Sequence, residues 1–505
     1  MKTVAALFSD QPAQGTALSA PGGTPLSFGA LRELCAATRQ ELNRLGIGRG
    51  DRVAIVLPNG PQMATAFIAV AHAATAAPLN PAYRADEFEF YLSDLNARAL
   101  LVERGSTSVA RDVAQRLSVP VIELVHDAEA GAGGFRLDTV AMPGAECGAP
   151  GEPQDDDGAL VLHTSGTTSR PKIVPLSQRN LWASARGIAT TLAFTPQDIG
   201  LNVMPLFHIH GLIAGILAPL SAGASVSCTP GFDALKFFGW MEEVKPTWYT
   251  AVPTMHQAII ARAARNADAV ARSRLRFARS SSSSLPPQVL ALLEETFRCP
   301  VVEAYGMTEA THQMASNPLP PAARKPGTVG VAAGPEIAIM DTDGNLLPRG
   351  ATGEIVIRGE SVTAGYEANP KANAEAFVNG WFRTGDQGTM DADGYVSITG
   401  RLKEIINRGG EKVSPREVDE VLMDHPAVAQ VVTFAVPHDK LGEDVAAAVV
   451  LREGAQATEK ELREFVAQRL ADFKVPRKVL LLDEIPKGAT GKLQRIGLAQ
   501  KLGLT

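Results

Sequence analysis

The sequence contains few cysteines, and their spacing excludes two common kinds of site. The four cysteines (Cys35, Cys147, Cys228 and Cys299) lie far apart in 505 residues and form no C-x-x-C pair. This spacing argues against a disulfide framework and a zinc site, and favours reduced thiols in a cytoplasmic protein. The G-x-x-x-x-G-K-[ST] pattern of a Walker A loop is also absent, so a nucleotide would need another kind of loop.

Long hydrophobic segments and an excess of positive charge are absent as well. The N-terminal residues have no apolar stretch of signal-peptide length, and Asp10 interrupts them early. Residues 211–228 carry no charge, but glycine, proline and serine punctuate them, so they predict a buried helix and strand. The formal net charge of −6 argues against nucleic acid or an anionic membrane as the main partner. We therefore expect a soluble monomer or homodimer.

Alternating patterns in the N-terminal part predict a layered α/β domain. Helical periodicity at 28–45, 62–74 and 85–95 alternates with strand patterns at 52–57 and 99–102. The length of the chain exceeds what one hydrophobic core supports, so at least two domains are expected.

The character of the sequence changes near its last hundred residues. Residues 328–399 have mostly β patterns, whereas two amphipathic helices are predicted further on, at 415–423 and 459–470. Residues 131–157 are rich in glycine, proline and acidic side chains and predict a connecting loop. We expect a mixed α/β fold of several subdomains. Its predicted parts are an N-terminal domain at 1–400 with layered α/β sheets and a β-barrel-like part, a hinge at 401–403, and a small mobile α+β domain at 404–505.

The most informative motif lies at 162–172, directly after an apolar run that predicts a buried strand. Its hydroxyl, glycine and cationic residues include Thr164, Ser165, Gly166, Thr167, Thr168 and Lys172. Hydroxyls and free backbone N–H groups in such a loop can bind polyphosphate oxygens, and the cations add positive charge. Taken alone, the stretch is more typical of a Ser/Thr-rich surface turn.

Five further segments fit the same nucleotide chemistry. They are 305–309 (Tyr-Gly-Met-Thr-Glu), 381–386 (Trp-Phe-Arg-Thr-Gly-Asp), 400–404 (Gly-Arg-Leu-Lys-Glu), 409–415 (Gly-Gly-Glu-Lys-Val-Ser-Pro) and 486–492 (Pro-Lys-Gly-Ala-Thr-Gly-Lys). An aromatic ring such as Tyr305 can stack on a purine, and a carboxylate such as Glu309 can hold Mg²⁺ on phosphate oxygens. Asp386 follows a tight turn and is suited to accepting hydrogen bonds from both ribose hydroxyls.

With these motifs in this order, the chain from about residue 25 onward resembles the adenylate-forming superfamily of acyl-CoA synthetases, aryl-CoA ligases and luciferases. Within it, the sequence is most similar to the oxalyl-CoA synthetase (oxalate–CoA ligase) group. The shared features are Thr-Ser-Gly-Thr-Thr-Ser-Arg-Pro-Lys at 164–172 and the segments 303–312 and 316–320. The resemblance implies a ligase that converts a carboxylate, ATP and CoA to acyl-CoA, AMP and diphosphate through an acyl-adenylate.

The resemblance also implies which residues bind ATP and Mg²⁺. The residues assigned to ATP are Thr164, Ser165, Gly166, Thr167, Thr168, Lys172, Ser283, Glu303, Ala304, Tyr305, Asp386 and Arg401. Tyr305 would lie against adenine, and Asp386 would bind the ribose. Glu309 would hold Mg²⁺ with help from Thr308 or Thr164.

Catalysis and domain rotation are assigned to residues nearer the C-terminus. Lys492 would bridge the substrate carboxylate and the α-phosphate, where negative charge accumulates as the two meet. Lys403 corresponds to the hinge about which the C-terminal domain turns between the two half-reactions. The loop Arg408-Gly409-Gly410 would then reach the active site, and its glycines would let the pantetheine arm of CoA pass close to the backbone.

The segments that line the carboxylate pocket in relatives are polar in this chain. An apolar tail gains affinity mainly by burial, whereas a short diacid needs hydrogen-bond donors for its second carboxylate. We expect Ser282 and His312 to contact the distal carboxylate of oxalate, His210 to line the pocket, and His208 to lie near the reacting carbonyl. The alternative is that His208 and His210 are partly buried histidines with structural hydrogen bonds.

Other substrates and acceptors fit part of the same pattern. Malonate or another small carboxylate is one alternative, but a malonate ligase is expected to carry an arginine in the pocket. The motif register places neither Arg274 nor Arg279 there. An adenylation enzyme that loads a carrier protein is a second alternative. A non-catalytic relative would have lost residues such as Lys492, Glu309 and Asp386, which are all present.

Overall fold

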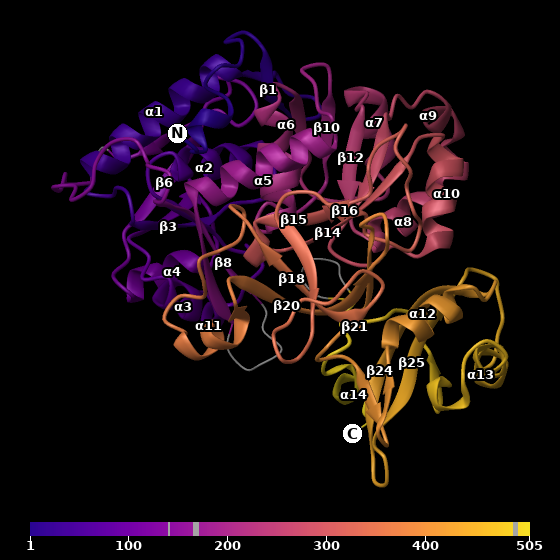
Figure 1. Ribbon diagram of the computed structural model, residues 1–505. Helices are drawn as coiled ribbons and strands as arrows, with labels where there is room; N and C mark the ends of the chain where they lie inside the picture. Colours follow the sequence, from indigo (N-terminus) through magenta and orange to yellow (C-terminus); the bar gives the residue numbers. More distant parts are fainter. Residues whose placement is uncertain (140–141, 165–170, 488–492, 505) are drawn as a thin grey trace.

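The described residues of the computed structural model form four β-sheets with helices packed around them (Figure 1). The model describes residues 1–139, 142–164, 171–487 and 493–504. The mixed α/β class with several sheets and a small C-terminal unit is confirmed.

The first sheet has seven strands, and all neighbours run parallel except the two edge pairs. Across the sheet the strands are β7 (Phe135–Asp138), β6 (Val121–His126), β5 (Ala99–Glu103), β3 (Arg52–Val56), β4 (Thr75–Pro78), β8 (Gly158–Thr164) and β9 (Lys172–Ser177). The loop predicted for 131–157 is wrong at β7. A four-residue edge strand is too short to show alternation, and antiparallel pairing with β6 orders it.

The second sheet has nine strands and a parallel centre. Across the sheet they are β16 (Val331–Ala332), β15 (His312–Ser316), β14 (Val301–Met307), β13 (Phe277–Ser280), β12 (Trp248–Ala251), β10 (Ile199–Asn202), β11 (Ser225–Cys228), β1 (Thr16–Ser19) and β2 (Leu26–Ser27). Strands β12, β13 and β14 are parallel, so their carboxyl ends lie at one edge. Ligands of parallel sheets bind at this edge, beyond the strand ends.

Helices pack between these two sheets and bury one face of each (Figure 1). They are α2 (Pro61–Ala71), α5 (Gln178–Thr191), a π-helical segment (His210–Leu217) and α6 (Ala218–Ser221). Helix α2 contacts β4 and β8 on one side and β11 on the other. The uncharged stretch 211–228 therefore forms a buried helix and a strand, as predicted. Helix α5 begins at a capping box in which Ser177 and Asn180 bond each other's backbone N–H.

Other helices pack around these two sheets. On and around the first sheet they are η1 (Ala5–Leu7), α1 (Phe28–Arg44), α3 (Ala85–Asp94) and α4 (Ala110–Arg116). On the second sheet they are α7 (Phe237–Val244), α8 (Pro253–Ala263), η3 (Ala264–Asn266), α9 (Ala267–Ala271) and α10 (Pro287–Phe297). The helices predicted at 28–45, 62–74 and 85–95 are confirmed. Their apolar residues at helical spacing form the core beneath the sheets.

The third sheet is antiparallel and holds the predicted ribose contacts. Its strands are β17 (Glu336–Met340), β18 (Thr352–Arg358), β20 (Trp381–Met390) and β19 (Phe377–Val378), with β21 (Val396–Arg401) paired to β20. Helix α11 (Pro370–Ala376) precedes β19. This sheet is the part predicted to be barrel-like, and its described strands form an open, bulged path. Its register sets Asp386 opposite Arg401.

The fourth sheet forms the C-terminal unit, drawn in yellow-orange in Figure 1. Its strands are β23 (Glu411–Val413), β22 (Ile406–Arg408), β25 (Gly442–Leu451), β24 (Val428–His438) and β26 (Lys478–Leu481). Its helices are α12 (Pro415–Met423), α13 (Glu459–Ala467), η5 (Asp472–Lys474) and α14 (Leu498–Lys501). The amphipathic helices predicted at 415–423 and 459–470 are confirmed, with Val418 and Leu462 buried. Gln257 of α8 donates to the carbonyl of Ala429 at 3.2 Å, which joins this unit to the second sheet.

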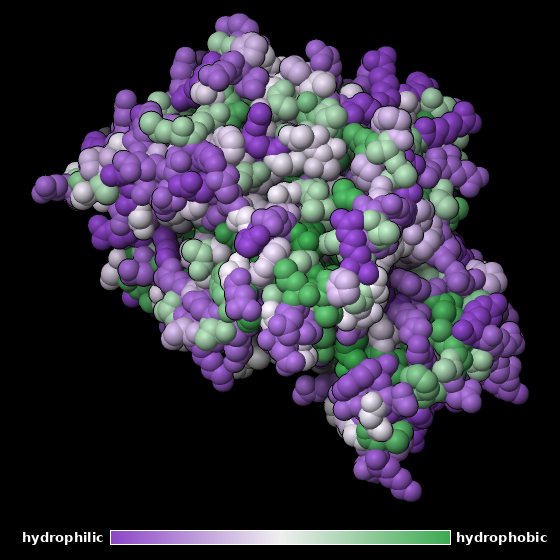
Figure 2. Space-filling model, in the orientation of Figure 1, coloured by the Kyte–Doolittle hydropathy of each residue, from purple (hydrophilic) through white to green (hydrophobic). Residues whose placement is uncertain are grey.

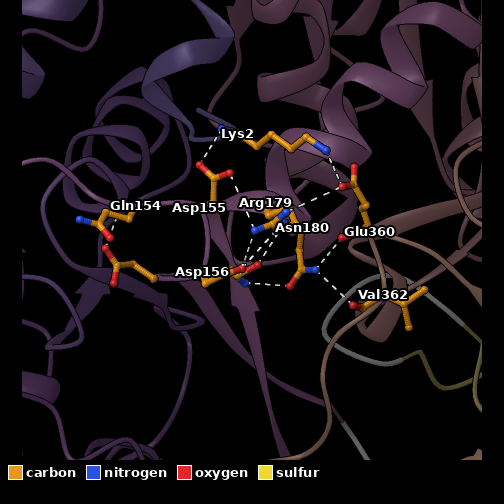
Figure 3. Close-up of polar contacts among 10 residues, drawn as sticks. Lys2, Gln154, Asp155, Asp156, Arg179, Asn180, Glu360 and Val362 are labelled. Atoms are coloured by element: carbon orange, nitrogen blue, oxygen red, sulfur yellow. Dashed lines mark hydrogen bonds and ion pairs between the residues drawn. The ribbon is translucent and has the colours of Figure 1, made fainter. Parts of the chain in front are cut away.

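A polar network ties the N-terminus to the start of α5 and to the loop at 359–363 (Figure 3). The backbone N–H of Lys2 donates to Asp155 at 2.8 Å, and its ammonium group pairs with Glu360. Asn180 Nδ2 donates to the carbonyl of Glu360 at 2.7 Å. The same loop reaches the predicted active site, because Thr363 N–H donates to the carbonyl of Glu309 at 2.7 Å.

The surface is mixed in polarity. On the face drawn in Figure 2, hydrophilic residues dominate the outline, and hydrophobic residues are scattered between them. Within the described ranges, no helix has both the length and the apolar character that a membrane span requires.

Candidate active site

Strand β14 holds the run of five serines at 280–284 (the serine run) in place. Glu303 Oε1 accepts a hydrogen bond from the N–H of Leu285 at 2.9 Å, and the carbonyl of Ala304 accepts one from Ser281 Oγ at 2.9 Å. Ser282 lies between these two anchors, half-buried, with a left-handed φ of 75°. Burial raises the pKa of Glu303 to about 7, although the Leu285 N–H opposes the shift. The serine run is therefore fixed beside β14.

Tyr305, Asp386 and Arg401 form one polar group near the end of β14, in which Tyr305 and Asp386 are buried and Arg401 is exposed. The Tyr305 hydroxyl donates to the Asp386 carboxylate, and Arg401 Nε donates to Asp386 Oδ1 at 3.1 Å. Burial raises the pKa of Asp386, while the charge of Arg401 opposes the rise. The carboxylate has acceptor capacity for further donors, such as hydroxyl groups of a ribose.

Lys172, Tyr366 and Glu309 form a second group. The Tyr366 hydroxyl donates to Glu309 Oε1 at 2.8 Å, and the Lys172 ammonium lies 4.2 Å from the centre of the Tyr366 ring. Burial raises the pKa of Glu309, and Tyr366, Arg401 and Lys172 all oppose that rise. Because the charges of Arg401 and Lys172 both act on Glu309, the two groups belong to one site. The sequence motifs did not indicate Tyr366, since it lies in no recognised segment and is placed only by tertiary packing.

The residues present fit a Mg²⁺ ion that is held mainly by phosphates. No group of three or more His, Cys, Asp or Glu side chains that could hold a metal occurs in the described part of the chain. Glu309 is a single buried carboxylate beside the cation Lys172. Mg²⁺ is commonly bound by one or two carboxylates together with substrate phosphates and waters, and a lone glutamate matches that pattern.

His210 and His312 stack on each other although they are far apart in the sequence. Their ring centres are 4.7 Å apart, with an angle of 18° between the planes. His210 Nδ1 lies 3.0 Å from Ser282 Oγ, which joins the histidines to the serine run. The backbone of His312 lies close to Gly306 of β14, and only glycine fits there, because a Cβ would lie 1.9 Å from the carbonyl oxygen of His312. Three of the four predicted substrate residues thus meet in the structure.

Arg279 lies against the same two histidines. Its side chain is fully buried, and its guanidinium reaches Nε2 of His210 at 3.2 Å and Nε2 of His312 at 3.1 Å. The motif register placed this arginine away from the pocket segments, whereas the structure brings it against two of the predicted substrate residues. The signal that could have found Arg279 is its position on β13, directly before the serine run and opposite Val302 of β14.

The remaining predicted residues of the large part lie around these groups. His208 is half-buried and its ring centre lies 4.9 Å from that of Phe207. Thr308 begins the short 3-10 helix η4 (Thr308–Ala310) that carries Glu309. Thr164 ends β8 opposite Lys172, and Ser283 is exposed.

Predicted residues of the C-terminal part make contacts within that part. Arg408 Nε donates to Asp444 at 2.6 Å, and the N–H of Gly409 donates to the carbonyl of Leu441 at 2.9 Å. Gly409 and Gly410 form the turn between β22 and β23, with φ of 61° and 102°. Lys403 is exposed.

Some predicted residues lie outside the described part of the chain. They are Ser165, Gly166, Thr167, Thr168 and Lys492. Their assigned roles therefore stay predictions from the sequence.

Comparisons with known proteins identify the family and the fold of this chain. Residues 5–367 match the family model of AMP-binding enzymes, and residues 417–492 match the model of the AMP-binding enzyme C-terminal domain. The oxalate–CoA ligase of Arabidopsis thaliana is 46% identical over 506 residues, which span 99% of this chain and 97% of that protein. The sulfoacetate–CoA ligase of Cupriavidus necator is 36% identical, over 98% of this chain and 97% of that protein.

The solved structures extend this likeness to the whole fold. The crystal structure of ATP-bound MatB from Rhodopseudomonas palustris is 29% identical and has a TM-score of 0.87, covering 99% of this chain and 97% of that chain. Family models matching both parts and a relative of nearly equal length leave one assignment. The chain belongs to the family of AMP-binding enzymes, as its sequence motifs predicted.

Proposed function

We propose that this protein is an oxalate–CoA ligase, which converts oxalate, ATP and CoA to oxalyl-CoA, AMP and diphosphate. The family match and the likeness to an oxalate–CoA ligase support an ATP-dependent acid–CoA ligase. One structural observation carries the choice of acid. The buried His210 and His312 and the half-buried Ser282 form a polar cluster where an acid with an apolar tail would need apolar side chains.

The two groups described above bind different parts of ATP: one binds the nucleoside, and the other binds the phosphates. Tyr305 lies against adenine, and Asp386, oriented by Arg401, accepts hydrogen bonds from the ribose hydroxyls. Lys172 and the loop at 164–168 bind the β- and γ-phosphates. Glu309 and Thr164 would hold Mg²⁺, which neutralises phosphate charge when it is bound.

In the first half-reaction, a carboxylate oxygen of oxalate attacks the α-phosphorus of ATP, and the bond to diphosphate breaks. Both reactants are anions, so the approach needs a positive charge between them. Lys492 supplies that charge, because a lysine on a glycine-flanked loop can reach both partners. Within the large part, Tyr366 keeps Glu309 oriented through the 2.8 Å hydrogen bond.

The acyl site recognises oxalate through donors rather than through apolar contact. Each buried methylene contributes about 0.8 kcal/mol, and oxalate has none to bury. Its second carboxylate therefore has to be matched by Ser282, His312 and their neighbours. A site built on such bonds can reject analogues that lack the partner by about 10⁴- to 10⁵-fold.

In the second half-reaction, the CoA sulfur attacks the carbonyl carbon near His208, AMP leaves, and the thiol proton is released. We propose that the domain at 404–505 turns against the domain at 1–400 about the hinge at 401–403, with Lys403 at its centre. The loop Arg408-Gly409-Gly410 then approaches the carbonyl and passes the pantetheine arm. An exposed hinge residue fits this role, since it loses no buried contact on rotation.

Malonate, another small acid or transfer to a carrier protein are the alternatives. To separate the acids, the rate of AMP release is measured with MgATP and CoA for oxalate, malonate, sulfoacetate, succinate, acetate and 4-coumarate. CoA, pantetheine and a carrier protein serve as acceptors in parallel. Preference for oxalate and CoA supports the proposal. Preference for an acid with an apolar tail would contradict the interpretation of the polar cluster.

A further inference from the structure

The guanidinium of Arg279 is buried without a carboxylate partner among the described residues. Its four acceptors there are His210 Nε2 at 3.2 Å, His312 Nε2 at 3.1 Å, Gln313 Oε1 at 3.1 Å and Thr250 Oγ1 at 3.4 Å. Its Nε–H is buried with no hydrogen-bond partner in the described part of the chain. Burial lowers the pKa of Arg279 to about 9, so the side chain still carries its charge at neutral pH.

The contacts of Arg279 determine the tautomer of both histidines. A guanidinium has N–H donors and no acceptor, so each Nε2 that faces it must present a lone pair. His210 Nε2 also lies 2.7 Å from Thr250 Oγ1, and with the lone pair on Nε2 the Thr250 hydroxyl is the donor in that contact. The proton of each neutral ring is then on Nδ1. A second proton on either ring would point an N–H at the guanidinium, and two stacked imidazolium rings 4.7 Å apart would repel each other. Both histidines are therefore neutral Nδ1–H tautomers.

The same arrangement orients the hydroxyl group of Ser282. His210 Nδ1–H, 3.0 Å from Ser282 Oγ, donates to that oxygen. The hydroxyl of Ser282 then uses its own proton as a donor to another group. A chain of hydrogen bonds from Arg279 through His210 to Ser282 thus ends in a donor, and each bond in such a chain strengthens the next.

An unpaired buried cation also attracts an anion. Leaving a buried charge without a counter-charge is costly, and a bound anion nearby reduces that cost. A monocarboxylate brings one negative charge, and its carboxylate loses that charge in the first half-reaction when it bonds to the α-phosphorus. Only an acid with a second anionic group keeps a negative charge near Arg279 after adenylation.

We propose that Arg279 is a positioning residue of the acyl site, which holds His210 and His312 as neutral Nδ1–H tautomers and selects acids with a second anionic group. This inference rests on the proposed function for its kinetic part. Its tautomer part is independent of any substrate, so the two can fail separately.

The first test reads the tautomers directly. The full-length protein is labelled with ¹⁵N-histidine and examined by NMR without substrate at neutral pH, with His210→Asn and His312→Asn to assign the signals. Both rings are expected to show a protonated Nδ1 and a bare Nε2. A protonated Nε2 on either ring overturns the proposal, whatever acid the enzyme uses.

The second test separates positioning from a purely structural role. Arg279→Gln removes the charge, and Arg279→Lys keeps the charge but lacks the planar, fixed donor geometry of the guanidinium. Arg276→Gln is the matched control, because Arg276 precedes the same strand but pairs with Asp198 at 3.0 Å. All three are compared with the unaltered enzyme for the KM of oxalate, the KM of ATP and kcat.

Arg279→Gln is expected to raise the KM of oxalate by about 10- to 100-fold, the range for losing a hydrogen bond to a charged group. The KM of ATP should stay unchanged, and Arg279→Lys should recover part of the loss. A folded Arg279→Gln enzyme with an unchanged oxalate KM overturns the proposal. So does an equal rise in the KM values of oxalate and ATP. If Arg279→Gln does not fold, Arg279→Lys and the NMR measurement decide.

Discussion

Glu303 makes the stability of this protein depend on pH in an unusual direction. Its side chain is buried, one oxygen accepts a hydrogen bond from Leu285, and the other oxygen has no partner in the described part of the chain. Burial raises its pKa from an ordinary value of 4.5 to about 7. We predict that Glu303→Gln stabilises the protein at alkaline pH and has much less effect at acidic pH.

The sign and the size of this change in stability with pH follow from the difference in the pKa of Glu303 between the folded and unfolded states. Between about pH 4.5 and about pH 7 the folded state binds a proton that the unfolded state has released, so folding stability falls as the pH rises. A pKa raised from 4.5 to about 7 corresponds to about 3 kcal/mol of lost stability above pH 7. Glutamine resembles the protonated acid, because its amide places a donor at the second oxygen. Effects of the substitution on stability that do not depend on pH are the same at both pH values and cancel in the comparison.

Urea unfolding of both proteins at about pH 5 and about pH 8 measures this effect. The stability of Glu303→Gln relative to the unaltered protein should increase by about 2 to 3 kcal/mol between the two conditions. Glu295→Gln, at an exposed glutamate of α10, is the matched control for the loss of one charge. A difference for Glu303→Gln that is the same at both pH values would refute the argument from burial.

Three further predictions concern catalysis. Tyr366→Phe keeps the ring beside Lys172 but removes the donor to Glu309, and should lower kcat/KM about 10- to 100-fold with little change in the melting temperature. An unchanged kcat/KM would show that Glu309 needs no such partner. Lys492→Ala should nearly abolish diphosphate release yet spare CoA transfer from pre-formed acyl-adenylate, and equal loss of both steps would contradict its role. His312→Ala should raise the KM of oxalate more than that of ATP, and an unchanged oxalate KM would remove His312 from the pocket.

Local rules explain how much of the structure could be predicted from the sequence. The strand predicted at 52–57 lies at Arg52–Val56, and the helix predicted at 415–423 lies at Pro415–Met423, with a proline at its first position. Both depend on residues within a few positions of each other. The family also followed from the sequence, because its motifs are short stretches whose residue types and order can be read without knowing what they contact.

Contacts between distant residues needed the tertiary structure. Arg279 and His312 are 33 residues apart, and Arg279 and His210 are 69 apart, yet they meet because β13, β15 and the π-helical segment pack together. Tyr366 reaches Glu309 across 57 residues for the same kind of reason.

The sequence by itself determined the fold class, the family and the residue types at the proposed nucleotide site. The tertiary structure decided that a buried arginine lies behind the polar cluster and that a tyrosine lies between the lysine and the glutamate. The physical reason is that burial and pairing energies depend on what surrounds a side chain, and those neighbours come from parts of the chain that no local pattern connects.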